Sequence, residues 1–376
     1  MLNLKRIYIK LILIFLIIFP KGGFKIGDIP ITWGYLLLLF SIPLCLLKGL
    51  KYINRNRFRV FILTLPFIIY SSILLILRFN SDNLGFTLSF CLSILFLPFI
   101  FLILYSKILD SKIFNDIFPF ILLWGIRIVI VFGLFLFLYK KYFNQTFEIP
   151  YLTVNIDDDM EQKNNNRQGI TKLYSTYNNG NIYGICMHII TPLYLMHEKK
   201  NIFKVLFLLT LFLTLSRTIW IGVFIEYIFF FINSFLKRKN IFLTIISGLA
   251  LISGFPYLLS FMNKDVNFIM DKDLGGRLYL FDILNNISLF GSGAFRGISE
   301  IVYLSIIQTF GLVGFILFLL YLFAPIIIFN FTKTRNKLYL GLLTYIFLCM
   351  SDGAILLIPV MCFYWFVSSY MFKKKL

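Results

Sequence analysis

Four charged residues lie close together in the stretch Leu274–Gly314, which is polar and rich in glycine within an otherwise apolar chain. They are Arg277, Asp282, Arg296 and Glu300, and an apolar run long enough to cross a membrane follows them directly. A charge placed against a membrane-spanning helix is costly unless it pairs or binds something. We therefore expect this stretch to form half of a binding or catalytic site at one face of a membrane.

Three arginines have the surroundings that phosphate recognition requires. The guanidinium group is planar, always charged and able to donate two parallel hydrogen bonds to phosphate. Arg217 lies between two apolar runs in LTLSRTIWIGV, which places it at a tight turn between helices. Arg277 follows two glycines and Arg296 lies among glycines, so the backbone at both can approach a ligand closely. The alternatives are an interfacial arginine anchored beside Trp220 and simple ion pairing with nearby acids.

Glu300 is the best-placed carboxylate near these arginines. It precedes the apolar run directly, and it can serve as a general base there; the alternative is that it answers the dipole of the helix that follows. A second polar segment, NNNRQGITKLYSTYNNGNIYG, carries Arg167 and leads past Asn178 and Asn181 into another apolar run. The alternative for Arg167 is an ordinary solvated loop.

Ionisable residues inside the apolar runs form a separate class. Arg127 and Glu226 indicate function by default in a membrane, and the alternative is that they pair with each other. His188 and His197 have no metal-ligand partner at a suitable spacing, and the chain has no HExxH, P-loop, GxSxG or dinucleotide-binding motif. The five cysteines lie in or beside apolar runs without a CxxC pair, so we expect them to pack rather than to bind zinc or form disulfides.

The elements that must position these residues are helices. Hydrophobic residues make up 59% of the 376 residues, whereas soluble proteins contain roughly 45–50%. Apolar runs recur at about the 20-residue length that crosses a bilayer. We predict an all-α polytopic integral membrane protein with a single membrane domain over residues 1–376. Its apolar runs predict about twelve transmembrane helices, at residues 7–20, 32–48, 60–77, 84–106, 117–139, 180–197, 202–216, 218–236, 241–261, 301–329, 338–351 and 354–371.

Charge predicts how these helices are oriented. The net charge is +19, and the basic loops and tails all fall on one side of the predicted spans. Because cytoplasmic loops are rich in Lys and Arg, we predict that both termini are cytoplasmic. The charge then reflects membrane topology, and we expect no nucleic acid partner. The opposite side carries two long loops, 140–179 and 262–300, which hold ten of the 17 acidic residues. Long loops in a compact protein are usually functional.

The order of short motifs along the chain resembles that of a known family. The first long loop ends in an Arg–Gly…Asn-Xaa-Tyr-Gly pattern, followed by LTLSRT, by GGRLYLF…GSGAF and by YLSIIQTFGLVGFILFL, which an acid precedes. Together with twelve spans and two outer loops, this order resembles the O-antigen polymerase and O-antigen ligase superfamily of bacterial envelope glycosyltransferases. The resemblance covers roughly Arg167 to Leu320.

The resemblance implies a multi-pass enzyme of the bacterial inner membrane, with a fold like that of the GT-C glycosyltransferases and two long periplasmic loops. Its donor would be an undecaprenyl-pyrophosphate-linked oligosaccharide, with no cofactor or metal. The lipid bilayer and a membrane protein that regulates chain length are the other implied partners.

The same resemblance implies roles for individual residues. Breaking the bond between sugar and pyrophosphate develops negative charge, which positioned guanidinium groups stabilise. We expect Arg217 and Arg277 to act in this way, with Glu300 as the general base for the acceptor hydroxyl. The expected contacts to pyrophosphate or sugar are Arg167, Arg296, Tyr174, Tyr177, Asn178 and Asn181.

Three alternatives stay open. Ligases of the superfamily typically carry a histidine in the second outer loop, and this loop has none, which favours a polymerase over a ligase. A flippase for lipid-linked oligosaccharides would place polar residues near the middle of the membrane, on broken helices and with an internal repeat. A protein that binds glycan without catalysis is the third alternative.

Overall fold

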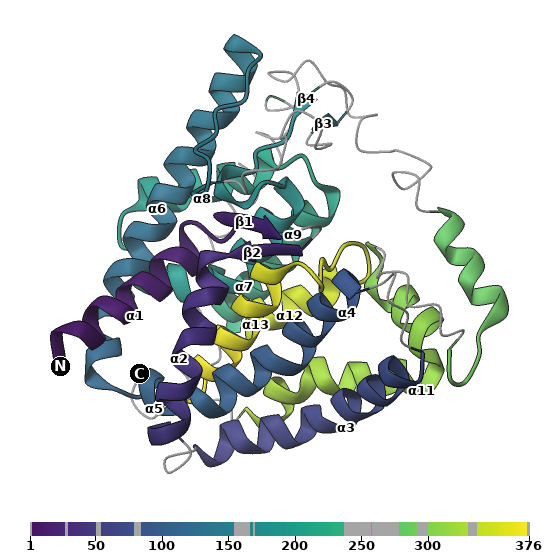
Figure 1. The fold of residues 1–376 in the computed structure, drawn as a ribbon. Coiled ribbons are helices and arrows are strands. Elements are labelled where there is room, and N and C mark those ends of the chain that lie inside the picture. The colour runs from purple at the N-terminus through teal and green to yellow at the C-terminus, as the bar shows by residue number, and fades with distance from the viewer. Residues whose placement is uncertain are drawn as a thin grey trace.

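The computed structural model describes residues 2–26, 29–49, 54–78, 84–153, 166–167, 170–236, 257, 278–291, 300–329 and 337–373. Helices dominate these ranges (Figure 1). The α-helices are α1 (Leu2–Ile17), α2 (Trp33–Gly49), α3 (Arg55–Leu77), α4 (Leu84–Phe90), α5 (Ser106–Leu109), α6 (Lys112–Phe143), α7 (Gly180–His197), α8 (Asn201–Leu213), α9 (Arg217–Leu236), α11 (Val302–Ile328), α12 (Leu338–Leu348) and α13 (Ile358–Tyr370). Two π-helical segments, η3 (Cys91–Phe96) and η4 (Phe99–Leu104), continue α4, and the 3-10 helices are η5 (Ser175–Tyr177) and η7 (Leu278–Asn286).

Helices cover most of the described residues of the predicted spans, but residues 214–216 and 354–357 are not helical. The bounds of α7 coincide with the predicted range, and α9 and α11 begin and end within one residue of theirs. Only residue 257 of the ninth predicted span, 241–261, lies among the described residues. Within the described part of the chain, the helices long and apolar enough to cross a membrane are Arg55–Leu77, Leu84–Leu104, Lys112–Phe143 and Val302–Ile328, and shorter apolar helices cover Trp33–Pro43, Asn201–Leu213 and Leu338–Leu348. These helices support a multi-pass helical membrane protein.

Two short antiparallel hairpins depart from the predicted all-helical chain. Strand β1 (Gly23–Ile26) pairs with β2 (Ile29–Thr32) between α1 and α2. Strands β3 (Asn166–Arg167) and β4 (Ile170–Thr171) form a second hairpin within the first predicted long loop. Both hairpins lie in connections between helices.

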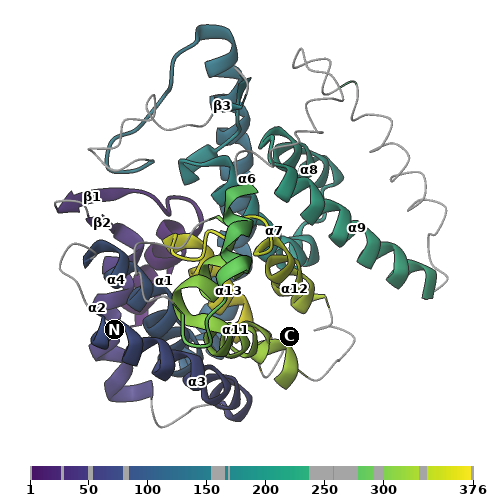
Figure 2. The same ribbon diagram turned by 90° about the vertical axis from the view of Figure 1, so that its right-hand side faces the viewer.

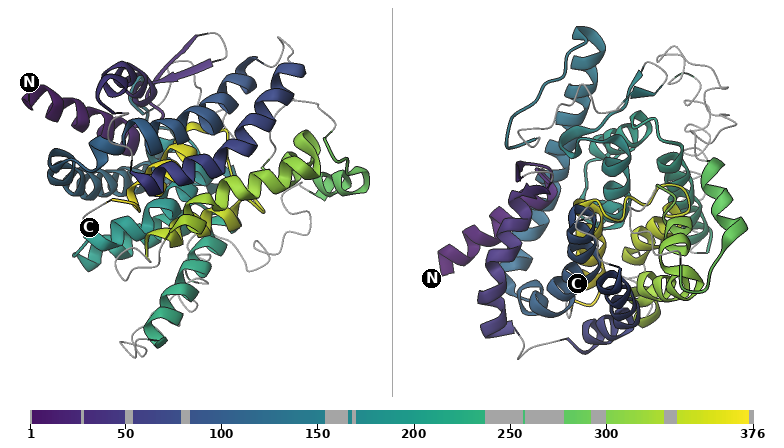
Figure 3. Two further views of the ribbon diagram at one scale, coloured as in Figure 1. Left: turned by 90° about the horizontal axis from the view of Figure 1, so that it is seen from below. Right: turned by 45° about the vertical axis from the view of Figure 1, so that its right-hand side comes forward.

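The core contains a central helix and a long aromatic seam. α7 packs against α9, α12 and α13 (Figure 2), and its apolar side chains are buried on all sides, as expected of a helix that is hydrophobic all round. α3 and α11 lie side by side along most of their length (Figure 3). Phe67 of α3 anchors this seam, because its ring contacts those of Phe310, Phe318 and Tyr321 on α11.

The helix bundle has two ends of different character. At the end that we call the terminal end, the buried guanidinium of Arg57 joins three segments by donating to the carbonyls of Ser106 (2.8 Å) and Ser369 (2.9 Å) and to both carboxylate oxygens of Asp110 (3.0 Å each). Such complete pairing offsets the cost of burying the charge. At the opposite end, which we call the loop end, α7, α9 and α11 begin and α12 ends.

Candidate functional site

A cluster of polar residues from distant parts of the chain meets at the loop end. We call it the polar junction. Its members come from the starts of α7 and α9, from the residue preceding the α11 segment and from the turn between α12 and α13. They are Asn181, Arg217, Thr218, Glu300, Ser351, Asp352 and Gly353.

The start of α7 is set by an asparagine cap. The side-chain oxygen of Asn179 accepts hydrogen bonds from the backbone N–H groups of Asn181 (2.8 Å) and Ile182 (3.3 Å), which satisfies two of the otherwise unpaired donors of the first turn. This places Asn181 in the first turn, where its Nδ2 donates to Oδ2 of Asp352 at 2.5 Å. The Oδ1 atom of Asn181 is buried, and no described residue donates to it. The hydrogen bond between the two side chains therefore places the acceptor oxygens of Asn181 and Asp352 close together.

The start of α9 is held by a strained turn. Leu215 is fully buried with a φ of 53°, in the left-handed region that costs a branched side chain free energy. Two hydrogen bonds support the turn: the indole N–H of Trp220 donates to Phe212 O (3.0 Å), and Leu173 N donates to Leu213 O (2.9 Å). Trp220 therefore braces the turn with its ring nitrogen, rather than acting only as an interfacial anchor.

Arg217 is the first residue of α9 and is half-buried. The next residue, Thr218, shares a hydrogen bond of 2.8 Å with the hydroxyl of Ser351 in the turn after α12. The N-terminus of a helix carries partial positive charge, which disfavours a cation such as Arg217 there. An anion bound at this position would be stabilised both by Arg217 and by the N–H groups of α9.

Glu300 reaches the junction through its backbone. Its carbonyl accepts a hydrogen bond from Gly353 N (3.2 Å), and the carbonyl of Gly353 accepts one from the hydroxyl of Tyr345 (3.0 Å). The side chain of Glu300 is exposed. Because Ile301 occupies the N-cap position of α11 without a side-chain cap, Glu300 lies one residue outside the helix. Its exposed side chain lies at the edge of the junction, outside the helix.

Helix α11 is broken ten residues into its length. Gly311 has φ 73° and ψ −175°, a conformation essentially restricted to glycine. The N–H groups of Leu312 and Val313 donate to the carbonyls of Ser288 (3.1 Å) and Leu289 (3.2 Å). On the other side of the break, the hydroxyl of Tyr70 donates to Phe310 O at 2.9 Å. The chain after η7 is thereby fixed against α11, and the backbone groups released by the break find partners within the protein, as a membrane helix requires.

Unusual backbone conformations gather around the junction. Non-glycine residues with positive φ cost free energy and tend to cluster at functional sites. In the described part of the chain, four of them lie in the segments that form the junction: Ser175, Asn178, Leu215 and Ala354.

Several residues expected from the sequence are placed elsewhere. The ring of Tyr177 is fully buried and its hydroxyl donates to Ile17 O (2.9 Å), so it packs in the core and offers no face to a sugar. Tyr174 and Asn178 are also buried, and burial, assisted by the Glu148 carboxylate, raises the pKa of Tyr174 to about 12. Arg167 lies in β3, where it pairs with Ile170. Arg277 and Arg296 lie outside the described residues.

Asp352 and its neighbours belong to the junction although their sequence alone did not indicate it. Asp352 is 5% exposed, and with Ser351 it supplies two of the side-chain contacts that hold the junction together. The available signal was the pair Asp352 and Gly353, which lies between the last two predicted spans. Because the turn between these spans is short, its carboxylate must lie close to the ends of the neighbouring helices.

Arg127 and Glu226, for which mutual pairing was the alternative to a function, have different partners in the structure. Arg127 does not pair with Glu226; it forms two hydrogen bonds of 2.8 Å with Glu198, which follows α7. The hydrogen bonds from Arg127 lower the pKa of Glu198 to about 2. Glu226 instead lies 3.1 Å from Nδ1 of His188, whose Nε2 is 2.9 Å from Ile219 O. The imidazole fits against α9 because Gly222 has no side chain there.

The junction combines chemistry for an anion with chemistry for hydroxyl groups. Three helix N-termini and Arg217 favour negative charge. The carboxylates of Glu300 and Asp352, with Oδ1 of Asn181, can accept hydrogen bonds from hydroxyls. Among the described residues, no group of three or more His, Cys, Asp or Glu side chains is arranged to hold a metal ion. Free cysteines among them are Cys91, Cys186, Cys349 and Cys362. Comparison of the chain with protein-family models, with curated proteins and with solved structures finds no match.

Proposed function

We propose that this protein is an O-antigen polymerase of the bacterial inner membrane, with a GT-C-like fold and both termini in the cytoplasm. It transfers a growing glycan from undecaprenyl pyrophosphate to the non-reducing end of a new lipid-linked repeat unit at the periplasmic face. The observation that carries the proposal is the convergence of the starts of α7 and α9 with Glu300, because these are segments in which the sequence resembles the superfamily.

The chemistry of transfer uses both halves of the junction. The bond between sugar C1 and the pyrophosphate oxygen breaks, and its electron pair leaves on the undecaprenyl pyrophosphate. A new bond forms between C1 and the acceptor hydroxyl, whose proton passes to a carboxylate. Arg217 stabilises the leaving group, with Arg277 as the second arginine in the proposal.

Two carboxylates of the junction suit the role of proton acceptor. Glu300 is exposed and therefore accessible to an acceptor sugar. Asp352 is buried and held by Asn181, which suits it to orient a hydroxyl or a neighbouring cation. We assign proton acceptance to Glu300 and positioning to Asp352.

The experiment is complementation of a strain that lacks the gene. A polymerase predicts surface lipopolysaccharide capped by a single repeat unit, restored to long chains by the intact gene. Arg217→Ala should fail to restore chain length at normal expression. Arg59→Ala, the same substitution at an exposed position at the start of α3, is the matched control and should restore it. Loss of all capped glycan in the deletion strain would instead point to a ligase.

A flippase for lipid-linked oligosaccharides is the second candidate, and two observations favour it. The break in α11 at Gly311 and the buried pair of His188 and Glu226 resemble the broken helices and interior ionisable residues of transporters. Accumulation of repeat units on the cytoplasmic face of the deletion strain, with no capped glycan at the surface, would establish this candidate in place of the polymerase.

A further inference from the structure

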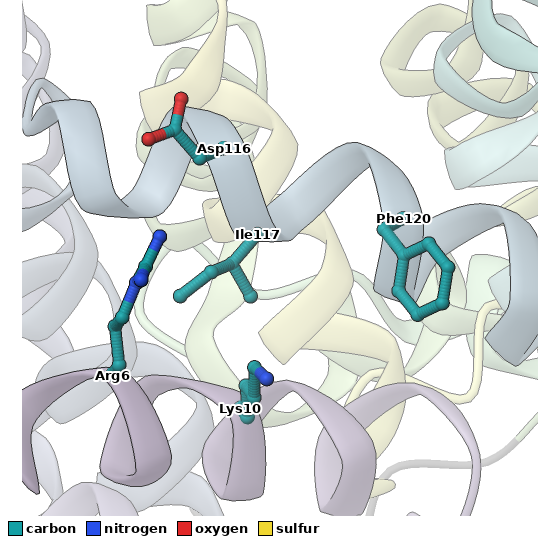
Figure 4. A pocket seen from close by; sticks show the side chains of 5 residues that line it. All are labelled: Arg6, Lys10, Asp116, Ile117 and Phe120. Carbon is teal, nitrogen blue, oxygen red and sulfur yellow. The ribbon is translucent and has the colours of Figure 1, made fainter. Parts of the chain in front are cut away.

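A hollow lies between α1 and α6 near the terminal end, far from the polar junction. Its volume is about 290 Å³, and its walls are Arg6, Lys10, Asp116, Ile117 and Phe120 (Figure 4). Arg6 and Lys10 are one helical turn apart on α1, so they face the same side. The other three residues come from the first turns of α6.

The two cations have no anionic partner within the described part of the chain. Both side chains are exposed, and neither forms an ion pair with a described carboxylate. Arg6 reaches from α1 toward α6, while the carboxylate of Asp116 is turned away from α1 (Figure 4). The hollow therefore has a net positive wall, which attracts an anion and is opposed in part by Asp116.

The polar wall continues into an apolar one along the same face of α6. Asp116, Phe120 and Trp124 follow one another at intervals of four residues. Phe120 is 64% exposed and Trp124 is 51% exposed, and their ring centroids are 6.2 Å apart. The cations lie near the starts of the two helices, and the exposed aromatic rings lie further along α6. This arrangement complements a phospholipid, because the cations match its phosphate and the rings match its acyl chain.

We propose that the hollow binds an acidic phospholipid of the bilayer leaflet at the terminal end. Its phosphate lies between Arg6 and Lys10, and its acyl chain lies along Phe120 and Trp124. Basic pockets between membrane helices suit anionic headgroups. The alternative is that each basic side chain reaches separately to the headgroup region. That alternative does not account for the hollow that the two cations share or for the exposed aromatic rings beside it. This inference does not depend on the proposed polymerase activity.

The test is lipid binding by the purified full-length chain, followed by native mass spectrometry during titration with phosphatidylglycerol. At roughly 1 kcal/mol for each basic residue, the double variant Arg6→Gln, Lys10→Gln should bind about thirtyfold more weakly. The matched control is the double variant Lys5→Gln, Lys112→Gln, which removes the same charge at the same end without touching the hollow; it should bind as the unaltered protein does.

Two further variants separate a lipid site from a simple charge effect. Phe120→Ala leaves the charge unchanged and should weaken phosphatidylglycerol binding. Asp116→Asn removes the opposing charge and should tighten it severalfold. Equal binding by the two double variants, equal binding of phosphatidylcholine, or equally tight binding of glycerol phosphate without acyl chains would each overturn the proposal.

Discussion

Replacement of Gly311 by alanine tests how the segment 288–291 is fixed to α11. A Cβ at this position would lie 2.3 Å from Leu289 O and 2.4 Å from Gly291 N, and neither backbone atom can retreat as a flexible side chain would. The φ of 73° adds strain, because this conformation costs a residue with a side chain about 1–3 kcal/mol.

The expected loss of stability follows from these contacts. Separation of the two segments would release the hydrogen bonds from the N–H groups of Leu312 and Val313, each worth about 1 kcal/mol net. We expect the Gly311→Ala variant either to keep the contact and lose about 1–3 kcal/mol of unfolding free energy to backbone strain, or to release the 288–291 segment from α11 and lose about 2 kcal/mol with the two hydrogen bonds.

The assay is denaturant unfolding in detergent micelles, combined with limited proteolysis of the 288–291 segment. Gly85→Ala is the matched control, because a Cβ at Gly85 meets no atom within 4 Å. We expect the control to unfold as the unaltered protein does. Equal stability and equal resistance to protease in both variants would refute the account of the break.

Three further predictions concern single contacts. Gly222→Val should displace the imidazole of His188, since a Cβ at Gly222 would lie 2.6 Å from its Nε2; the melting temperature in detergent should fall, and an unchanged value would contradict this packing. Arg127→Ala should cost about 3–5 kcal/mol by leaving Glu198 buried without its partner. The folded pKa of Glu198, about 2, lies below the ordinary 4.5, so this contribution is complete above pH 4.5 and declines as the pH falls toward 2; a difference that persists at pH 2 would contradict the assignment. Asp352→Asn keeps an acceptor oxygen and should preserve stability within about 1 kcal/mol while shortening the glycan chains, whereas normal chain length would exclude the carboxylate from the site.

Helix positions could be predicted because the causes are local. The start of α7 is visible in the sequence: a polar Asn-rich segment gives way to an apolar run, and Asn179 is a strong capping residue. The turn before Arg217 is equally visible, because a short polar interruption divides two apolar runs. Both predictions depend only on neighbouring residues.

Contacts between distant residues could not be predicted in this way. Asn181 and Asp352 are 171 positions apart, and nothing near either residue identifies the other. The same holds for Arg127, whose partner proved to be Glu198 rather than Glu226, because the choice depends on how α6 crosses α7 and α8. The break at Gly311 was hidden for a related reason: one glycine in an apolar run is compatible with an unbroken helix until the segment that docks on it is known.

The most direct test of the proposed function is polymerisation by the purified chain in liposomes. The substrate is an undecaprenyl-pyrophosphate-linked repeat unit, and the products are separated by length. The account predicts chains of several units with the unaltered protein and with Arg59→Ala, and only the single unit with Arg217→Ala. Chains of normal length from Arg217→Ala, or no chains from the unaltered protein, would contradict it.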